Sequence, residues 1–298
     1  MTHETIKPES KEEWLSLRTK DLTSTDIPVL FNASPYSTYL ETWLKKRDRL
    51  QTVFEPNDRM KWGNRLERAI AEGIAEDEGF EVYPMKDYKR IPELRLGSSF
   101  DYFIGDDGIL EIKNVDFVVA RDQWVDDEAP AHIELQVQHQ LLVSGRKFAY
   151  IGALVSGNQT IVFRRERDEE IISAIVEKSK AFWKSIEDGI EPAPVFPEDA
   201  ETIANIYGIS HPGKIVEADY EVDSFAYEYQ RVSEEIKRLT ELKDTAKARI
   251  LMRIGDAEKV ISPAYTISAG NTAPKRVEAH ERAGFRTFRV TFKKERAV

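Results

Sequence analysis

The chain of 298 residues contains no cysteine. This absence excludes disulfide bonds, thiolate zinc sites, iron–sulfur clusters and a cysteine nucleophile, and it fits a reducing compartment. The apolar runs are far shorter than the roughly 18 residues that a membrane-spanning helix needs. The polar N-terminal segment MTHETIKPESKEEW lacks the apolar core of a signal peptide. We therefore expect neither a membrane span nor a secretion signal.

Several catalytic signatures are missing as well. The sequence has no Gly-x-x-x-x-Gly-Lys-Ser/Thr, Gly-x-Gly-x-x-Gly or Gly-x-Ser-x-Gly motif, which argues against a P-loop, a dinucleotide-binding turn and a nucleophile elbow. The five histidines lack the spacing of a zinc site. The chain has 53 acidic and 43 basic residues, a net charge of −10, and this excess alone argues mildly against a polyanionic partner.

The residues that are present suit a globular protein of one or two domains, since 41% of them are apolar. Hydrophobic periodicity and turn signals predict a mixed α/β fold, in which helices flank one central sheet. The expected helices lie within 11–50 and at 60–79, 131–144 and 168–186, and the expected strands lie at 80–83, 97–104, 109–113, 148–155 and 160–164.

Three prolines between residues 192 and 197 indicate a boundary, so we expect one domain over 1–191 and an extension over 192–298. In the extension, apolar residues from Val222 to Leu239 follow a 3-4-3-4-3 spacing that Ala246 and Ile250 continue. This spacing predicts a long amphipathic helix or a helical hairpin with a coiled-coil-like seam. The segments 264–267 and 285–292 are expected to pair as a β-hairpin. Residues 275–298 form a basic tail, with eight lysines and arginines against three glutamates.

The most informative segment joins Asp101 to the Glu-Ile-Lys run at 111–113 through a Gly-Asp-Asp-Gly turn. The period of two in a strand places Glu111 and Lys113 on one face and Leu110 and Ile112 on the other. Two carboxylates that converge with a lysine suit a hard cation such as Mg²⁺ between them, and the backbone carbonyl of Ile112 offers a further oxygen ligand. The alternative is an ordinary solvated face or cross-strand ion pair, which is common in strands.

Two further segments favour a site. Glu67, early in the helix at 60–79, offers another carboxylate, although it also fits an ordinary surface position. Gln136 and Gln140 lie one turn apart on the helix at 131–144, where their amides could hold a phosphate oxygen or a water molecule. We interpret Gln138 as part of a polar helix face.

The order of these motifs resembles the YqaJ/lambda-exonuclease family of viral recombination nucleases, within the restriction-endonuclease-like, PD-(D/E)xK superfamily. The motifs are Gly-x-x-x-Glu at 63–67, Ser-x-x-Asp at 98–101, Leu-Glu-Ile-Lys at 110–113 and Gln-x-Gln-His-Gln-Leu-Leu-Val-Ser-Gly at 136–145. The N-terminal part agrees through Arg18, Thr25 and the segment 32–38, and the resemblance covers residues 14–188.

The resemblance implies a restriction-endonuclease-like core and a defined set of site residues. The catalytic residues would be Glu67, Asp101, Glu111, Lys113 and Gln136, with Lys113 orienting or activating the water. Glu67, Asp101, Glu111 and the Ile112 carbonyl would hold two Mg²⁺ ions, for which Mn²⁺ can substitute. Arg18 and Thr25 would contact the 5′-phosphate of the DNA.

The activity implied is a Mg²⁺-dependent 5′-to-3′ exonuclease on linear double-stranded DNA. It would leave 3′ single-stranded overhangs for phage-type recombination, through hydrolysis by metal-activated water that yields 5′-phosphomonoesters. The resemblance also implies a homo-oligomer, a single-strand annealing protein as a partner, and the cytoplasm of a bacterial host. Two alternatives stay open: an endonuclease or single-strand-specific nuclease on the same core, and a non-catalytic protein that binds DNA or a partner through the C-terminal helix and the basic tail.

Overall fold

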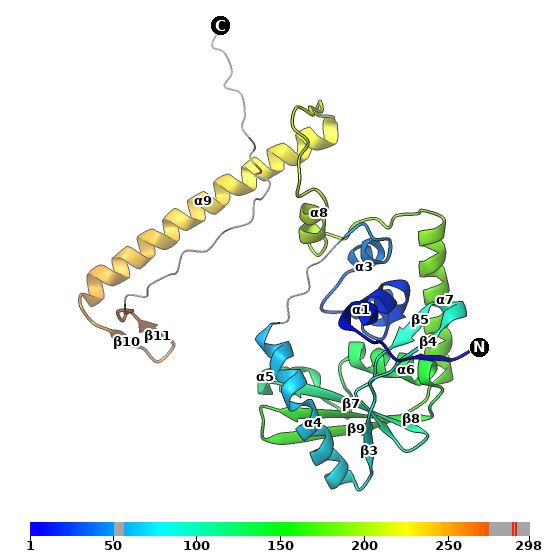
Figure 1. Cartoon of the computed structure of the whole chain (residues 1–298). Helices are drawn as coiled ribbons and strands as arrows, with labels where there is room; N and C mark the ends of the chain where they lie inside the picture. Colours follow the sequence, from blue (N-terminus) through cyan, green and yellow to red (C-terminus); the bar gives the residue numbers. More distant parts are fainter. Residues whose placement is uncertain (51–56, 274–287, 289, 291–298) are drawn as a thin grey trace. The chain divides into compact units, whose positions relative to one another are not determined.

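The computed structural model describes residues 1–50, 57–273, 288 and 290. The chain divides into two compact units, Met1–Ile206 and Tyr207–Val298, which are described separately (Figure 1). The first unit therefore extends past the end at residue 191 that the proline cluster suggests. Asp199 accepts a hydrogen bond from the hydroxyl of Thr38, and Ile203 and Ile206 pack against the main core, so this segment is tied to the first unit.

Helices and strands alternate in the first unit much as the periodicity predicts. Its α-helices are α1 (Lys11–Lys20), α2 (Ile27–Leu30), α3 (Tyr39–Lys46), α4 (Asp58–Glu78), α5 (Phe117–Gln123), α6 (Ala131–Ser144), α7 (Glu169–Glu187) and α8 (Ala200–Ile206), with a 3₁₀ turn at Pro92–Leu94. None of the helices in the described ranges is long and apolar enough to cross a membrane.

Two sheets form the first unit. The five-stranded sheet has the order β3-β6-β7-β8-β9, and the four-stranded sheet has the order β1-β4-β5-β2. The strands of the larger sheet are β3 (Val82–Pro84), β6 (Tyr102–Ile104), β7 (Gly108–Val115), β8 (Phe148–Val155) and β9 (Gln159–Glu166). Those of the smaller sheet are β1 (Glu4–Ile6), β2 (Leu22–Thr23), β4 (Tyr88–Ile91) and β5 (Leu96–Ser98). The predicted mixed α/β fold class is confirmed.

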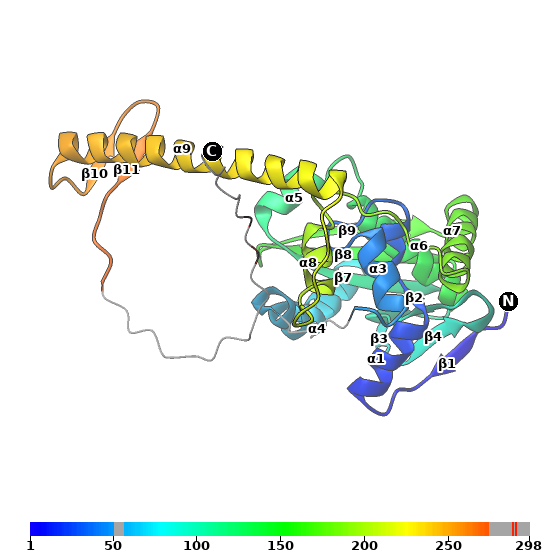
Figure 2. The same ribbon diagram turned by 90° about the horizontal axis from the view of Figure 1, so that it is seen from above.

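The larger sheet lies between two helical layers (Figure 2). β7 and β8 are parallel neighbours, and parallel strands need a long crossover, which α5 and α6 provide. Leu110 and Ile112 of β7 pack with Ile70 and Ile74 of α4, whereas Ile109 belongs to the core built with α6 and α7. A Cβ atom on Gly152 of β8 would lie 2.4 Å from Ile74 Cδ1, so glycine lets α4 approach the sheet closely.

The expected strand over 97–104 is two strands in different sheets. β5 pairs with β2 and β4, while β6 pairs with β3 and β7. The chain crosses from one sheet to the other at Phe100, whose side chain is buried in the core. Asp101 therefore lies at the junction of the sheets and not within a strand.

In the second unit, α9 (Tyr220–Ile254) is one continuous helix and not a hairpin. It is followed by a hairpin in which β10 (Lys259–Ile261) pairs with β11 (Thr266–Ser268) in antiparallel register. The segment 264–267, for which a hairpin with 285–292 is expected, overlaps β11, and the structure pairs β11 with β10. Apart from Phe288 and Val290, the predicted strand at 285–292 and the basic residues of the tail lie outside the described residues.

Candidate active site

Strand β7 carries the two charged side chains at the centre of the candidate site. Lys113 Nζ lies 2.5 Å from Glu111 Oε1. Glu111 is only 3% exposed and faces α6, because Leu110 and Ile112 occupy the opposite face against α4. The alternation along the strand therefore buries a carboxylate that would be costly to bury without hydrogen-bond donors.

Helix α6 supplies those donors from two positions one turn apart. Gln136 Nε2 donates to Glu111 Oε1 at 2.6 Å, and Gln140 Nε2 donates to Glu111 Oε2 at 2.7 Å. Lys113 Nζ also lies 3.3 Å from Gln136 Oε1. Both oxygens of Glu111 are thus fixed, and the strand and the helix are joined through one carboxylate.

Asp101 caps the end of the β6–β7 pairing. β6 begins at Tyr102 opposite Leu110, so Ile112 lies beyond its backbone partners. Asp101 Oδ2 accepts the hydrogen bond from the Ile112 N–H at 2.8 Å in their place. Because the N–H and C=O of a strand residue point to the same side, the Ile112 carbonyl faces the side of Asp101.

Glu67 on α4 is the third carboxylate near Lys113, so the cluster has more acidic than basic groups. Burial raises the pKa of Glu67, and the charge of Glu111 raises it further. Burial also raises the pKa of Asp101 well above its ordinary value, with a further contribution from Glu111, while Lys113 acts in the opposite direction. Burial alone would lower the pKa of Lys113, but Glu111 and Asp101 outweigh it and raise the pKa. Lys113 is therefore an ammonium ion in this setting.

The donor chemistry of the cluster fits a divalent cation. Three carboxylates and a carbonyl are hard oxygen ligands, and a single lysine only partly balances their charge. Among the described residues, no three acidic or histidine side chains already form a ready ligand set, because Glu111 is turned towards Lys113 and the two glutamines. Asp101 Oδ2 accepts the hydrogen bond from the Ile112 N–H.

Arg18 and Thr25 also lie together. Arg18 Nη2 donates to Thr25 Oγ1 at 3.2 Å, and the guanidinium carbon lies 4.6 Å from the centre of the Trp14 ring. An arginine paired with a hydroxyl is a common way to hold a phosphate group. The structure thus brings together the two residues that the family resemblance assigns to the 5′-phosphate.

Lys46 of α3 contacts the chain next to both members of this pair. It was not among the predicted site residues. Its Nζ donates to the carbonyls of Arg18 at 2.7 Å and Asp21 at 2.6 Å, and it lies 2.7 Å from Asp26 Oδ2. Burial alone would raise the pKa of Asp26, but Lys46 outweighs it and the pKa is lowered. In the sequence, Lys46 lies at the basic end of the expected helix.

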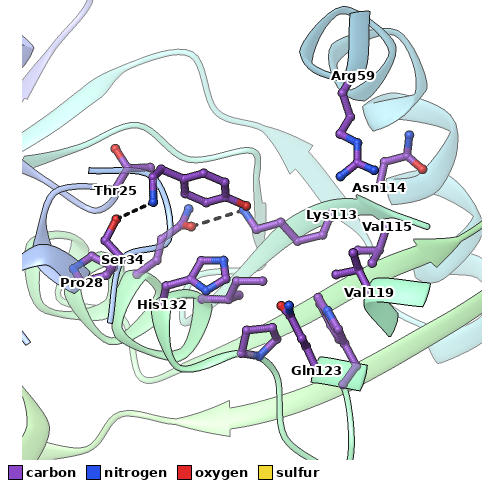
Figure 3. A pocket seen from close by; sticks show the side chains of 15 residues that line it. Thr25, Pro28, Ser34, Arg59, Lys113, Asn114, Val115, Val119, Gln123 and His132 are labelled. Carbon is purple, nitrogen blue, oxygen red and sulfur yellow. Dashed lines mark hydrogen bonds between the residues drawn. The ribbon is translucent and has the colours of Figure 1, made fainter. Parts of the chain in front are cut away.

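A cavity of about 260 Å³ is lined by one residue of the Arg18–Thr25 pair and by two residues that contact Glu111. Its lining includes Thr25 from the loop after β2 as well as Lys113 and Gln136 (Figure 3). Tyr36 and His132 also line it, with ring centres 5.6 Å apart in an edge-on contact. The cavity therefore leads from the predicted phosphate contact to the predicted catalytic lysine.

The neighbouring glutamines of α6 have different surroundings. Gln138 Nε2 donates to the carbonyl of Glu166, and its Oε1 accepts from the N–H of Asp168, so it joins α6 to the start of α7, away from the carboxylate cluster. Gln140, in contrast, contacts Glu111 directly. Its signal in the sequence is the four-residue spacing from Gln136.

Comparisons with known proteins agree with this fold. Residues 13–147 match the model of the YqaJ-like viral recombinase domain. The chain is 26% identical over 255 residues to the uncharacterized protein YqaJ of Bacillus subtilis (strain 168), which covers 84% of this chain and 80% of that protein.

Two solved structures are similar in fold. A crystal structure of an alkaline exonuclease from Laribacter hongkongensis superposes with a TM-score of 0.52 at 22% identity, covering 61% of this chain and 95% of that one. A structure of the same exonuclease in complex with dAMP gives a TM-score of 0.50, with the same identity and coverage. The domain match confirms the resemblance to the YqaJ family, and the two solved structures show a similar fold.

Proposed function

Because residues 13–147 form a YqaJ-like viral recombinase domain, we propose that this chain is a metal-dependent DNA exonuclease. The observation that carries the proposal is the buried Glu111 carboxylate, which Lys113, Gln136 and Gln140 hold beside Asp101. An ordinary strand ion pair is solvated and contributes little. A buried carboxylate with three donors, next to two more carboxylates of raised pKa, instead suits the binding of a cation.

The residues of the cluster take distinct roles in this proposal. Asp101, Glu111, Glu67 and the carbonyl of Ile112 would hold two Mg²⁺ ions, with Mn²⁺ as a substitute. When bound, such ions neutralise phosphate charge and increase the acidity of water. Lys113, as an ammonium ion, donates hydrogen bonds to the attacking water or to a non-bridging phosphate oxygen. Gln136 and Gln140 fix the orientation of Glu111.

The substrate proposed is the end of a linear DNA duplex. Arg18 and Thr25 would bind a terminal 5′-phosphate, and the cavity that Thr25 shares with Lys113 would receive the end of the strand. Digestion would then run from 5′ to 3′, release 5′-phosphomonoesters and leave a 3′ single strand for recombination. The fold shared with an exonuclease whose structure has been determined with dAMP supports a nucleotide ligand. By family resemblance, the protein would act as a homo-oligomer and deliver the single strand to an annealing protein.

The first experiment measures digestion of a 5′-phosphorylated linear duplex with Mg²⁺ by the native protein and by Glu111→Ala and Lys113→Ala. We expect both variants to lose activity, and full activity in both would overturn the site assignment. Covalently closed plasmid is the substrate control, because an exonuclease leaves it intact, whereas cleavage of the plasmid would indicate an endonuclease.

A second experiment addresses polarity. Duplexes with a 5′-phosphate, a 5′-hydroxyl or a blocked end are digested by the native protein and by Arg18→Ala. The native protein should prefer the 5′-phosphate, and Arg18→Ala should lose that preference while keeping its activity on 5′-hydroxyl ends. A preference that survives the substitution would exclude Arg18 as the phosphate contact.

A further inference from the structure

Helix α9 presents an apolar stripe from Val222 to Ile250, which only Lys243 interrupts. The stripe, called the seam below, consists of Val222, Phe225, Tyr229, Val232, Ile236, Leu239, Ala246 and Ile250. α9 spans 35 residues and none of them is buried, and the seven large seam side chains are between 41% and 65% exposed. The 3-4 spacing of the seam is typical of a coiled coil, in which a second helix covers such a stripe.

The charges of α9 divide between its two halves. Residues 220–236 carry five acidic side chains and one arginine, whereas residues 237–254 carry six basic and two acidic side chains. The first half is therefore strongly negative and the second half strongly positive. A partner helix of the opposite polarity would complement both halves at once, and α9 itself is such a helix when its direction is reversed.

We propose that α9 pairs with α9 of a second copy of this chain in an antiparallel coiled coil. When the two antiparallel helices overlap fully, core positions whose residue numbers sum to 475 lie opposite each other. Each such pair joins an a position of one helix to a d position of the other. Ile236 then meets Leu239 at the centre. Towards the ends, the large Tyr229 meets the small Ala246, and Phe225 meets Ile250.

The residues beside the seam agree with the antiparallel direction. Glu228 and Arg249 occupy equivalent flanking positions in the heptad, and reversal of one helix brings each near the other in the partner. Lys243 interrupts the apolar seam, and the antiparallel arrangement places it opposite Val232, with its ammonium group free to reach solvent. A parallel pair in register would instead oppose Lys243 to itself and the acidic half to the acidic half.

A different occupant of the seam would be the C-terminal segment of the same chain. Of that segment the structure describes Phe288 and Val290; the Phe288 ring lies 5.3 Å from the Tyr229 ring and Phe288 is 73% exposed, so this one contact engages one of the eight seam positions. A second α9 engages all eight. The pairing surface lies outside the candidate active site, so its failure leaves the proposed nuclease function untouched.

The absence of cysteine permits a direct test on the full chain, because each introduced cysteine is the only thiol. Phe225→Cys and Ile250→Cys are prepared separately and treated with a short bismaleimide, alone and as an equimolar mixture. In the antiparallel pair, two copies of residue 225 lie 25 residues apart along the axis, or about 37 Å. We therefore expect a crosslinked dimer in the mixture and none from either variant alone.

Crosslinking of each variant alone would show a parallel pair, and absence of crosslinks in all three samples would show that the seam is covered otherwise; either result overturns the proposal. A second measurement is the mass of the full chain by light scattering. Ile236→Asp at the centre of the seam should halve the mass, while Thr245→Asp on the opposite face of the helix should leave it unchanged. Equal masses for the native chain and Ile236→Asp would contradict the pairing.

Discussion

Gln140 on α6 donates a hydrogen bond to Glu111 on β7 at 2.7 Å. Both side chains are buried, with 1% and 3% of their surfaces exposed. Among the described residues, Gln140 Oε1 has no hydrogen-bond partner, although a buried acceptor without a donor is costly. The side-chain amide of Gln140 is thus oriented so that its nitrogen donates to Glu111 while its oxygen has no donor in the described part of the chain. This orientation indicates that Gln140 positions the Glu111 carboxylate.

Replacing Gln140 with methionine, which has a similar shape, should lower nuclease activity about 10- to 100-fold, the usual range for residues that orient a metal ligand. The reason is that Glu111 Oε2 loses its donor and the carboxylate can rotate. The measurement is the initial rate on a 5′-phosphorylated duplex. Gln138→Met is the matched control on the same helix, and it should leave the rate unchanged. It should reduce stability by about 1–3 kcal/mol, because the carbonyl of Glu166 and the N–H of Asp168 lose their hydrogen-bond partner. Equal rates in the two variants would contradict the role of Gln140.

Divalent cations should stabilise the folded protein. Glu67 and Asp101 have raised pKa values because they are partly or largely buried near Glu111, and a bound cation relieves that repulsion. At a Mg²⁺ concentration of about 100 times the dissociation constant, the gain is about 2.7 kcal/mol. Thermal unfolding with Mg²⁺ and with EDTA measures it.

Asp101→Asn is the corresponding control for the cation effect. It removes one carboxylate charge while the amide oxygen can still accept the hydrogen bond from the Ile112 N–H. The shift in unfolding temperature with Mg²⁺ should shrink sharply in this variant. An equal shift in both proteins would mean that the cation binds elsewhere.

The parts of the site that depend on local backbone geometry could be predicted from the sequence. The period of two along β7 separates Glu111 and Lys113 from Leu110 and Ile112, and the turn of α6 brings Gln136 and Gln140 to one face. Both relationships need only the type of secondary structure. They do not depend on which elements pack together.

The remaining relationships depend on contacts between distant segments. Asp101 lies between two sheets because β5 and β6 find different partners, and the pattern of residues 97–104 carries no sign of that division. The role of Lys46 likewise arises from the packing of α3 beside the end of α1. No periodicity in the sequence distinguishes Lys46 from its neighbour Lys45.

Lys46→Met should destabilise the protein by about 1–3 kcal/mol, since it leaves the half-buried Asp26 carboxylate without its cationic partner. It should also weaken the preference for 5′-phosphate ends, because Arg18 and the loop with Thr25 lose their common anchor. Urea unfolding and the end-preference assay measure the two effects. Lys45→Met is the neighbouring control; its lysine forms a partly exposed pair with Glu41, so stability should change by less than about 1 kcal/mol. Similar losses in both variants would contradict the anchoring role.

His139 should make the stability of the protein sensitive to acid. The imidazole is fully buried, and burial lowers its pKa from 6.5 to about 3. Between these values the unfolded chain binds a proton that the folded chain does not, so the free energy of unfolding falls as the pH is lowered. The slope for one proton is about 1.4 kcal/mol per pH unit.

The measurement is urea unfolding at several pH values between about 6 and 4. In this range His139 stays neutral in the folded chain and becomes protonated in the unfolded chain. His139→Leu keeps an apolar group of similar size in the same core and removes this titration. The carboxylates and the other histidines titrate alike in the two proteins, so the difference between the two curves isolates His139. The variant should lose stability less steeply than the native protein, by up to about 1.4 kcal/mol per pH unit. Parallel curves would mean that the His139 imidazole is protonated as readily in the folded chain as in the unfolded one.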